Sequence, residues 1–81
     1  MIEVLFFGRV REELGCDALQ VTGVSDLDEL QNRLIDERGA RWAEVLQQDN
    51  IIRAVNQAVV ADNIALSEGD EVAFFPPVTG G

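Results

Sequence analysis

The chain has 81 residues and a formal net charge of −9, with 47% hydrophobic and 26% charged residues. This length fits one domain, which at this size buries only about 60% of its unfolded surface and cannot enclose a large substrate pocket. The negative charge argues against nucleic acid as a partner, because the phosphates would repel the chain. It suggests instead either a basic partner or a surface that is simply soluble.

The predicted elements begin with two strands. Residues 2–7 form an apolar run, interrupted only by Glu3, that predicts a central strand covered on both faces. Residues 9–14 are expected to form a short helical turn that ends at Gly15 in the left-handed conformation. Residues 18–22 alternate weakly and predict a second strand that pairs back on the first.

The clearest helix signal follows. Ser25 is the expected N-cap, with Asp28 three residues later in a pattern like a capping box, and Gly39 is the expected stop. Helical spacing aligns two apolar stripes, and we interpret both as core. The stripes consist of Leu27, Leu30, Leu34 and Ile35, and then of Trp42, Val45 and Leu46.

Three more strands are predicted after the helices. Residues 51–55 and 58–60 are joined across Asn56-Gln57, a turn follows at residues 67–70, and residues 71–75 form the last strand. The first and last strands are the most apolar and should pair in the middle of the sheet. The order predicts an α+β protein of the β-grasp type, with a mixed sheet and one main helix packed across it.

The residue inventory excludes most conventional catalysis. All six basic residues are arginines, so the chain has no lysine for a Schiff base and no histidine as a general base or metal ligand. Cys16 has no second cysteine as a partner, and we interpret it as an idle thiol in a reducing cytosol. The carboxylates fall at helix starts and turns without the spacing of a calcium loop, so we expect no metal site and no permanently bound cofactor.

Residues 76–81 form a predicted extended and flexible tail after a domain of residues 1–75. Pro76 and Pro77 cannot donate to a sheet, so the last strand should end there and a semi-rigid spacer begin. Six extended residues reach roughly 20 Å, enough to enter the active site of a partner. A frayed terminus that happens to be rich in glycine is the alternative.

The two final glycines suggest where the chemistry lies. Gly80 and Gly81 have no side chains to obstruct a narrow channel. A carboxylate is a poor electrophile, so the Gly81 carboxylate becomes reactive only when another enzyme activates it. We therefore expect the tail to be a substrate arm on which other enzymes act, and Gly81 to be its reactive residue.

Three stretches resemble a known family: MIEVLFFGRVREELG at the start, AVNQAVV in the middle and LSEGDEVAFFPPVTGG at the end. They resemble the small, sulfur-carrier subunits of molybdopterin synthase, which are ubiquitin-like proteins, and the resemblance runs from Met1 to Gly81. The diglycine alone is shared with ubiquitin and with the sulfur carrier of the thiamine pathway. The Phe-Pro-Pro-Val before it points to the molybdenum-cofactor branch.

The resemblance implies a cycle on Gly81. An ATP-dependent adenylating enzyme of the ubiquitin-activating type attaches AMP transiently to Gly81, and a persulfide donor converts the adenylate to a thiocarboxylate. The tail then enters the large synthase subunit and donates sulfur to cyclic pyranopterin monophosphate to form the molybdopterin dithiolene. The residues implied to enter the partner are Pro76, Pro77, Val78, Thr79 and Gly80.

The resemblance also implies an assembly, a heterotetramer of two large and two small subunits in which the small subunit is no enzyme on its own. Phe75 and Phe7 would then be docking residues rather than core. Three alternatives stay open: a protein modifier attached through Gly81, a sulfur carrier for thiamine, and an interaction domain with an acidic face. The start has no positive region, and residues 4–7 are too short for a signal or membrane segment, so we expect a cytoplasmic protein.

Overall fold

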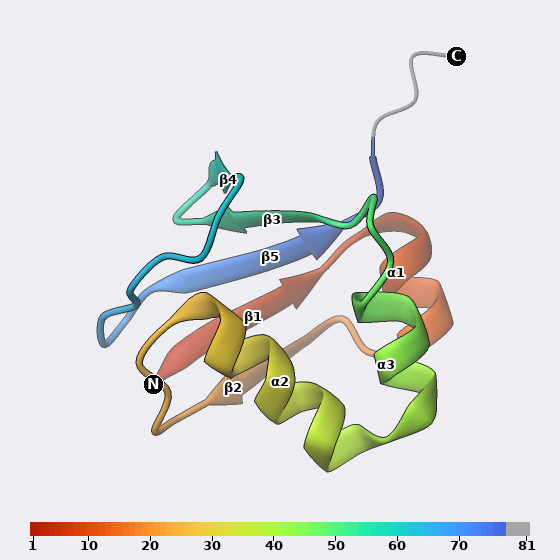
Figure 1. The fold of residues 1–81 in the computed structure, drawn as a ribbon, viewed down its shortest axis with the longest axis horizontal. Helices are drawn as coiled ribbons and strands as arrows, with labels where there is room; N and C mark the ends of the chain where they lie inside the picture. The colour runs from red at the N-terminus through yellow and green to blue at the C-terminus, as the bar shows by residue number, and fades with distance from the viewer. Residues whose placement is uncertain (78–81) are drawn as a thin grey trace.

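Within residues 1–77, five strands form one mixed sheet in the order β2-β1-β5-β3-β4 (Figure 1). This computed structural model describes residues 1–77. The strands are β1 (Ile2–Phe6), β2 (Ala18–Val21), β3 (Ile52–Val55), β4 (Ala58–Val60) and β5 (Glu71–Phe75). The predicted strands are therefore confirmed, although β1, β2 and β3 are each one residue shorter than expected.

The two central strands come from opposite ends of the chain. β1 runs parallel to β5, with Val4 opposite Val72 and Phe6 opposite Phe74, and none of the four is more than 1% exposed. β5 also pairs antiparallel with β3, so it is the middle strand of the sheet. The prediction that the first and last strands pair in the middle of the sheet is confirmed. Since the tail follows β5, the chain leaves the sheet from its middle strand.

Three helices complete the fold of the part of the chain that the structure describes: α1 (Gly8–Leu14), α2 (Leu27–Arg38) and α3 (Ala40–Leu46). α2 and α3 cover one face of the sheet, and α1 lies beyond the ends of β1 and β5 (Figure 1). The Trp42 ring of α3 packs edge-on against Phe6, with 5.3 Å between ring centroids, and Phe6 stacks on Phe74 at 5.8 Å. Aromatic pairs thus join the helix layer to the sheet in one core. Among the described residues, no helix is both long enough and apolar enough to cross a membrane.

The start of α2 differs from the prediction by one residue. Asp26, not Ser25, is the N-cap, and its Oδ1 accepts the Glu29 N–H at 2.8 Å. The Glu29 carboxylate in turn accepts the Ser25 N–H. Ser25 is held by a distant part of the chain, because its carbonyl accepts the Leu66 N–H at 2.9 Å. A tertiary contact therefore decides which of two adjacent capping residues is used.

The described residues leave the face of the sheet opposite α2 and α3 uncovered, so the expectation that β1 is buried on both faces is wrong. Among residues 1–77, no helix lies on that face (Figure 1). Side chains alternate along a strand, and Phe6 on the helix side is 1% exposed whereas Phe7 is 45% exposed. The apolar run of β1 and the residue after it therefore contribute both to the core and to a surface.

The turn before β5 is held by the Asp70 carboxylate. Its Oδ2 accepts the Ser67 N–H at 2.8 Å, and its Oδ1 accepts the side-chain amide of Asn56 at 3.0 Å. These bonds, the Ser67 bond first, hold the pKa of Asp70 below its ordinary value of 3.8 and outweigh the opposing effect of desolvation. The ionised carboxylate is therefore the form that stabilises the native turn.

Replacing Asp70 with asparagine should remove a pH-dependent part of the folding free energy. Because the pKa is lower in the folded state, this contribution is present above the unfolded pKa and fades as the pH falls through the folded pKa. We expect Asp70→Asn to lower the urea midpoint at pH 7, and the difference from the parent to shrink progressively below about pH 4. Urea unfolding followed by circular dichroism over a pH series measures it. A difference that is the same at every pH would contradict this role.

Candidate functional site

The chain leaves the sheet beside the first turn of α1. β5 ends at Phe75, as the prolines predict, and Pro76 lies against Gly8. A Cβ on Gly8 would come within 3.2 and 3.3 Å of two ring atoms of Pro76, and the φ angle of Gly8 is +58°. Gly8 therefore combines a left-handed backbone with a close approach to the proline ring.

The first two tail residues are held by the domain. Pro76 and Pro77 are both half-buried. With residues of α1, of α3 and of the segment before β3, they line a narrow cleft. Because both prolines also have a fixed φ angle, the domain sets the direction in which the chain passes residue 77.

The predicted reactive end lies outside the described residues. Val78, Thr79, Gly80 and Gly81 therefore stay predictions in their roles of tail insertion and chemistry. The division into a domain of residues 1–75 and a tail of residues 76–81 also stays a prediction. The structure describes the first two residues of the tail, Pro76 and Pro77, and the surface around them.

An apolar surface lies on the uncovered side of the sheet, next to the point where the tail leaves, and we call it the open face. The residues that line it are Leu5, Phe7, Ala54, Gln57, Val59, Glu71, Ala73 and Phe75. Strand register places Leu5, Ala73, Ala54 and Val59 in one row across β1, β5, β3 and β4. Two alanines stand in the middle of this row and larger side chains at its ends, which accounts for a hollow of about 490 Å³.

Several large apolar side chains of the open face are accessible. Val59 is 68% exposed and Phe7 is 45% exposed, while Leu5 and Phe75 are half-buried. Exposed apolar side chains that gather in a hollow mark interaction sites, unlike single exposed residues scattered over a surface. The structure thus brings together the two predicted docking residues, Phe7 and Phe75, on one face. Docking itself stays a prediction.

Sequence reasoning missed most of the open face. Ala54 and Val59 belong to strands whose pairing partners cannot be read locally, and Ala73 was predicted on the same side of the last strand as Phe75 but was given no role. A usable signal was present in β5, where Ala73 and Phe75 alternate with the buried Val72 and Phe74. Such a strand is apolar on both of its sides. If the helices cover only one face of the sheet, the apolar side chains on the other face are available to contact a partner.

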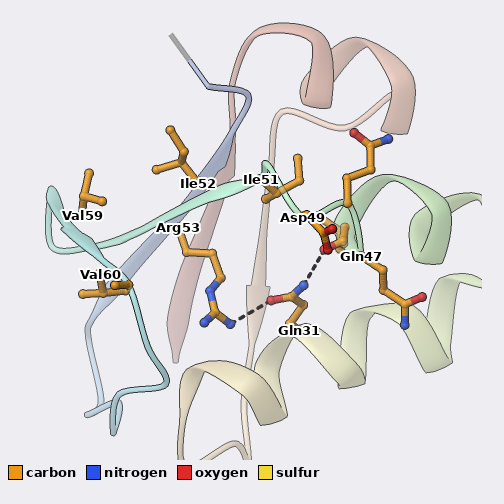
Figure 2. A pocket seen from close by; sticks show the side chains of 11 residues that line it. Gln31, Gln47, Asp49, Ile51, Ile52, Arg53, Val59 and Val60 are labelled. Carbon is orange, nitrogen blue, oxygen red and sulfur yellow. Dashed lines mark hydrogen bonds between the residues drawn. The ribbon is translucent and has the colours of Figure 1, made fainter. Parts of the chain in front are cut away.

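A second hollow, of about 430 Å³, lies between the helix layer and strands β3 and β4 (Figure 2). Arg53 reaches across it and donates to Asp28 at 2.7 Å and to Gln31 at 3.0 Å. Gln31 in turn donates to the Leu46 carbonyl at 2.6 Å. These bonds tie β3 to α2 and α2 to α3. The residues that line this hollow include no histidine, lysine or cysteine. We therefore interpret its polar network as a set of bonds that stabilises the packing of the helices on the sheet.

The described residues offer little chemistry of their own. Within residues 1–77, no group of three or more acidic or cysteine side chains is placed to hold a metal ion. Cys16 is half-buried, and its Sγ lies 3.5 Å from the Ala18 carbonyl oxygen. What the arrangement can do is present the base of a tail beside an apolar surface. The described residues include no histidine or lysine for acid–base chemistry.

Comparison with known proteins points in the same direction. The model of the ThiS family matches residues 4–81. The molybdopterin synthase sulfur carrier subunit of Escherichia coli (strain K12) is 46% identical over 81 residues, which is the full length of both chains. The similarity therefore includes the domain, the base of the tail and the terminal diglycine.

Two solved structures share the fold over nearly the whole chain. One is the protein–protein complex of subunits 1 and 2 of molybdopterin-converting factor from Helicobacter pylori 26695, with 30% identity, a TM-score of 0.73 and coverage of 99% of this chain and 97% of that one. The other is SAMP1, a small archaeal modifier protein from Haloferax volcanii, with 25% identity, a TM-score of 0.71 and coverage of 99% and 98%. The predicted ubiquitin-like β-grasp fold is confirmed.

Proposed function

The chain belongs to the ThiS family, and on that premise we propose that Gly81 carries sulfur for biosynthesis of the molybdenum cofactor. The full-length relative at 46% identity is a sulfur carrier subunit of molybdopterin synthase, which supports this assignment. The observation that carries the proposal is the position of β5. Its last residue, Phe75, lies in the open face, and the next residue, Pro76, begins the tail. A protein docked on the open face therefore lies beside the base of the tail.

The proposed chemistry takes place on the Gly81 carboxylate. The carboxylate attacks the α-phosphorus of ATP in an adenylating enzyme, and pyrophosphate leaves. A persulfide sulfur then attacks the acyl carbon and AMP leaves, after which a thiol cleaves the sulfur–sulfur bond and forms a disulfide. The product is a thiocarboxylate on Gly81. Its sulfur passes to cyclic pyranopterin monophosphate, hydrolysis restores the carboxylate, and two such transfers build the dithiolene.

The partner for the transfer step is proposed to be the large subunit of a molybdopterin synthase, in a heterotetramer of two large and two small subunits. A chain similar to this one occurs in a solved complex of subunits 1 and 2 of molybdopterin-converting factor, which supports a large-subunit partner. The sequence has neither lysine nor histidine. The general acid and base of the transfer are therefore expected on the large subunit.

The shape of the open face suggests how the large subunit docks. Ala54 and Ala73 form the floor of the hollow, and Phe7, Val59 and Phe75 rise around it. Such a hollow accepts a bulky apolar side chain from the partner while its own aromatic rims pack against the partner surface. Glu71 also lines the hollow and offers a negative charge at its border. The expected partner surface is apolar at its centre and basic at this edge.

The proposal is tested by mass spectrometry of the terminal residue. We expect incubation with ATP, a persulfide donor and the cognate adenylating enzyme to replace one oxygen of the Gly81 carboxylate by sulfur. Omitting ATP should prevent the change, because the free carboxylate is a poor electrophile. The Escherichia coli relative, treated in parallel, shows whether the adenylating enzyme is competent. An unchanged mass for this chain beside a loaded relative would overturn the proposal.

A second function shares the activation step and differs in the acceptor. The structural similarity to SAMP1 favours a protein modifier joined through Gly81 to lysines of other proteins. Probing a cell extract for isopeptide-linked products distinguishes the two functions. The sequence itself has no lysine, so such products cannot include side-chain-linked chains of this protein. Sulfur carriage for thiamine is a further alternative, and a transfer assay with the large synthase subunit separates it from the proposed function.

A further inference from the structure

The β3–β4 hairpin turns through two residues in an unusual backbone conformation. Asn56 has a φ of 50° and Gln57 a φ of 70°, and the turn connects the paired residues Val55 and Ala58. Two positive φ angles are what a two-residue hairpin of type I′ requires, and asparagine tolerates this region well. Glutamine in the second position is strained. Other contacts must therefore hold the turn in place.

The backbone and the side chain of Asn56 supply those contacts. The Asn56 N–H donates to the Glu71 carbonyl at 2.7 Å, and the Glu71 N–H donates to Asn56 Oδ1 at 3.0 Å. In a regular antiparallel ladder the backbone carbonyl of Asn56 would accept that second bond. Here the side chain takes its place, because the backbone has already turned away. The Asn56 amide also donates to Asp70 at 3.0 Å, so the turn is bonded to the start of β5 at three points.

This attachment matters for the open face because β4 is an outer strand. Among residues 1–77, β4 pairs only with β3, and its register with β3 places Val59 opposite Ala54. Gln57 and Val59 both line the hollow, and Val59 is 68% exposed. The hairpin twist, which the turn residues set, therefore determines where Val59 stands relative to the floor of the hollow.

We propose that Asn56 is a positioning residue for docking: its bonds to Glu71 and Asp70 hold the β3–β4 hairpin so that Val59 stands at the rim of the open face in the unbound protein. This inference rests on the proposed docking of the large synthase subunit. Pre-organised contact residues raise affinity because their ordering does not oppose association. Asn56 lies outside the hollow and acts through Val59.

The test is the dissociation constant of the large subunit, measured by calorimetry with the full chain at a temperature where every variant is folded. Asn56→Gly keeps the left-handed backbone accessible and removes both side-chain bonds, and we expect about tenfold weaker binding. Asn63→Gly is the matched control, because Asn63 Oδ1 accepts the Asp28 N–H at 2.8 Å at the start of α2, away from the open face. The control should bind like the parent.

A double-mutant cycle separates positioning from general stability. If Asn56 acts through Val59, Asn56→Gly should cost threefold or less in a Val59→Ala background, compared with about tenfold in the parent. Asn56→Asp is a second variant that still accepts the Glu71 N–H but replaces the bond to Asp70 with repulsion between two carboxylates, and it should bind more weakly than the parent. Parent-like binding by Asn56→Gly, or equal losses in both backgrounds, overturns the inference alone. A parent that does not bind the large subunit overturns the proposed docking as well.

Discussion

Deleting Gly81 is expected to reduce sulfur loading and sulfur transfer at least ~100-fold while the fold is retained. The deletion shortens the tail by one residue, or about 3.3 Å, and a misplacement of only about 1 Å can cost 10²-fold in rate. Every buried hydrophobic residue that the structure describes lies between Ile2 and Phe74, so the deletion removes none of this core. Single-turnover loading followed by mass spectrometry, together with thermal unfolding, measures both effects.

A variant of unchanged length is the control for this deletion. Gly81→Ala keeps the reach of the tail and adds one methyl group beside the reacting carbon. We expect it to be loaded more slowly than the parent, because the added methyl group hinders access to the acyl carbon. It should be loaded faster than the deletion variant, because the tail keeps its full length. Loading of the shortened chain at the parent rate would contradict the role of Gly81. A lower unfolding temperature for the shortened chain would contradict the expectation that Gly81 contributes nothing to folding stability.

Placing a charge on the open face is expected to abolish docking of the large subunit. Val59→Asp would bury an unpaired carboxylate at an apolar interface, which costs several kcal/mol, and each ~1.4 kcal/mol is tenfold in affinity. We expect the dissociation constant to rise at least ~100-fold. Because Val59 is 68% exposed in the free protein, the same change should have little effect on folding.

Ile64 provides the matched control for this substitution. It is also an exposed aliphatic residue, 40% accessible, but it is not among the residues that line the hollow. Ile64→Asp should therefore leave the dissociation constant near that of the parent. Equal losses of binding in the two variants would show that net charge, and not the open face, controls association. Parent-like binding by Val59→Asp would place the docking surface elsewhere.

Local sequence was a good guide where one segment decides its own structure. The apolar stripes on α2 and α3 were recognised from helical spacing, and Gly15 ends α1 with a φ of 64°, as expected. β5 ends at Phe75 because proline cannot donate to the sheet. These features depend on residues a few positions apart, and the relevant side chains are all visible in the sequence.

Local sequence did not predict features that depend on contacts with a distant segment of the chain. Ser25 and Asp26 are both good capping residues, and the choice of Asp26 depends on the bond from the Leu66 N–H to the Ser25 carbonyl. The burial of β1 was overestimated for the same reason. An apolar strand looks alike in sequence whether its second face meets a helix of the same chain or is left open for a partner.

By itself, the sequence of this protein determined the order of the elements, the absence of lysine and histidine, and a proline-led tail that ends in Gly80-Gly81. Those properties led us to predict the chemistry at Gly81, because the chain has no lysine or histidine to act as a nucleophile or general base. Only the tertiary structure decided that Leu5, Ala54, Val59 and Ala73 share one row of the open face. That row joins four strands whose pairing depends on register between segments far apart in the chain, and packing of the whole core selects that register.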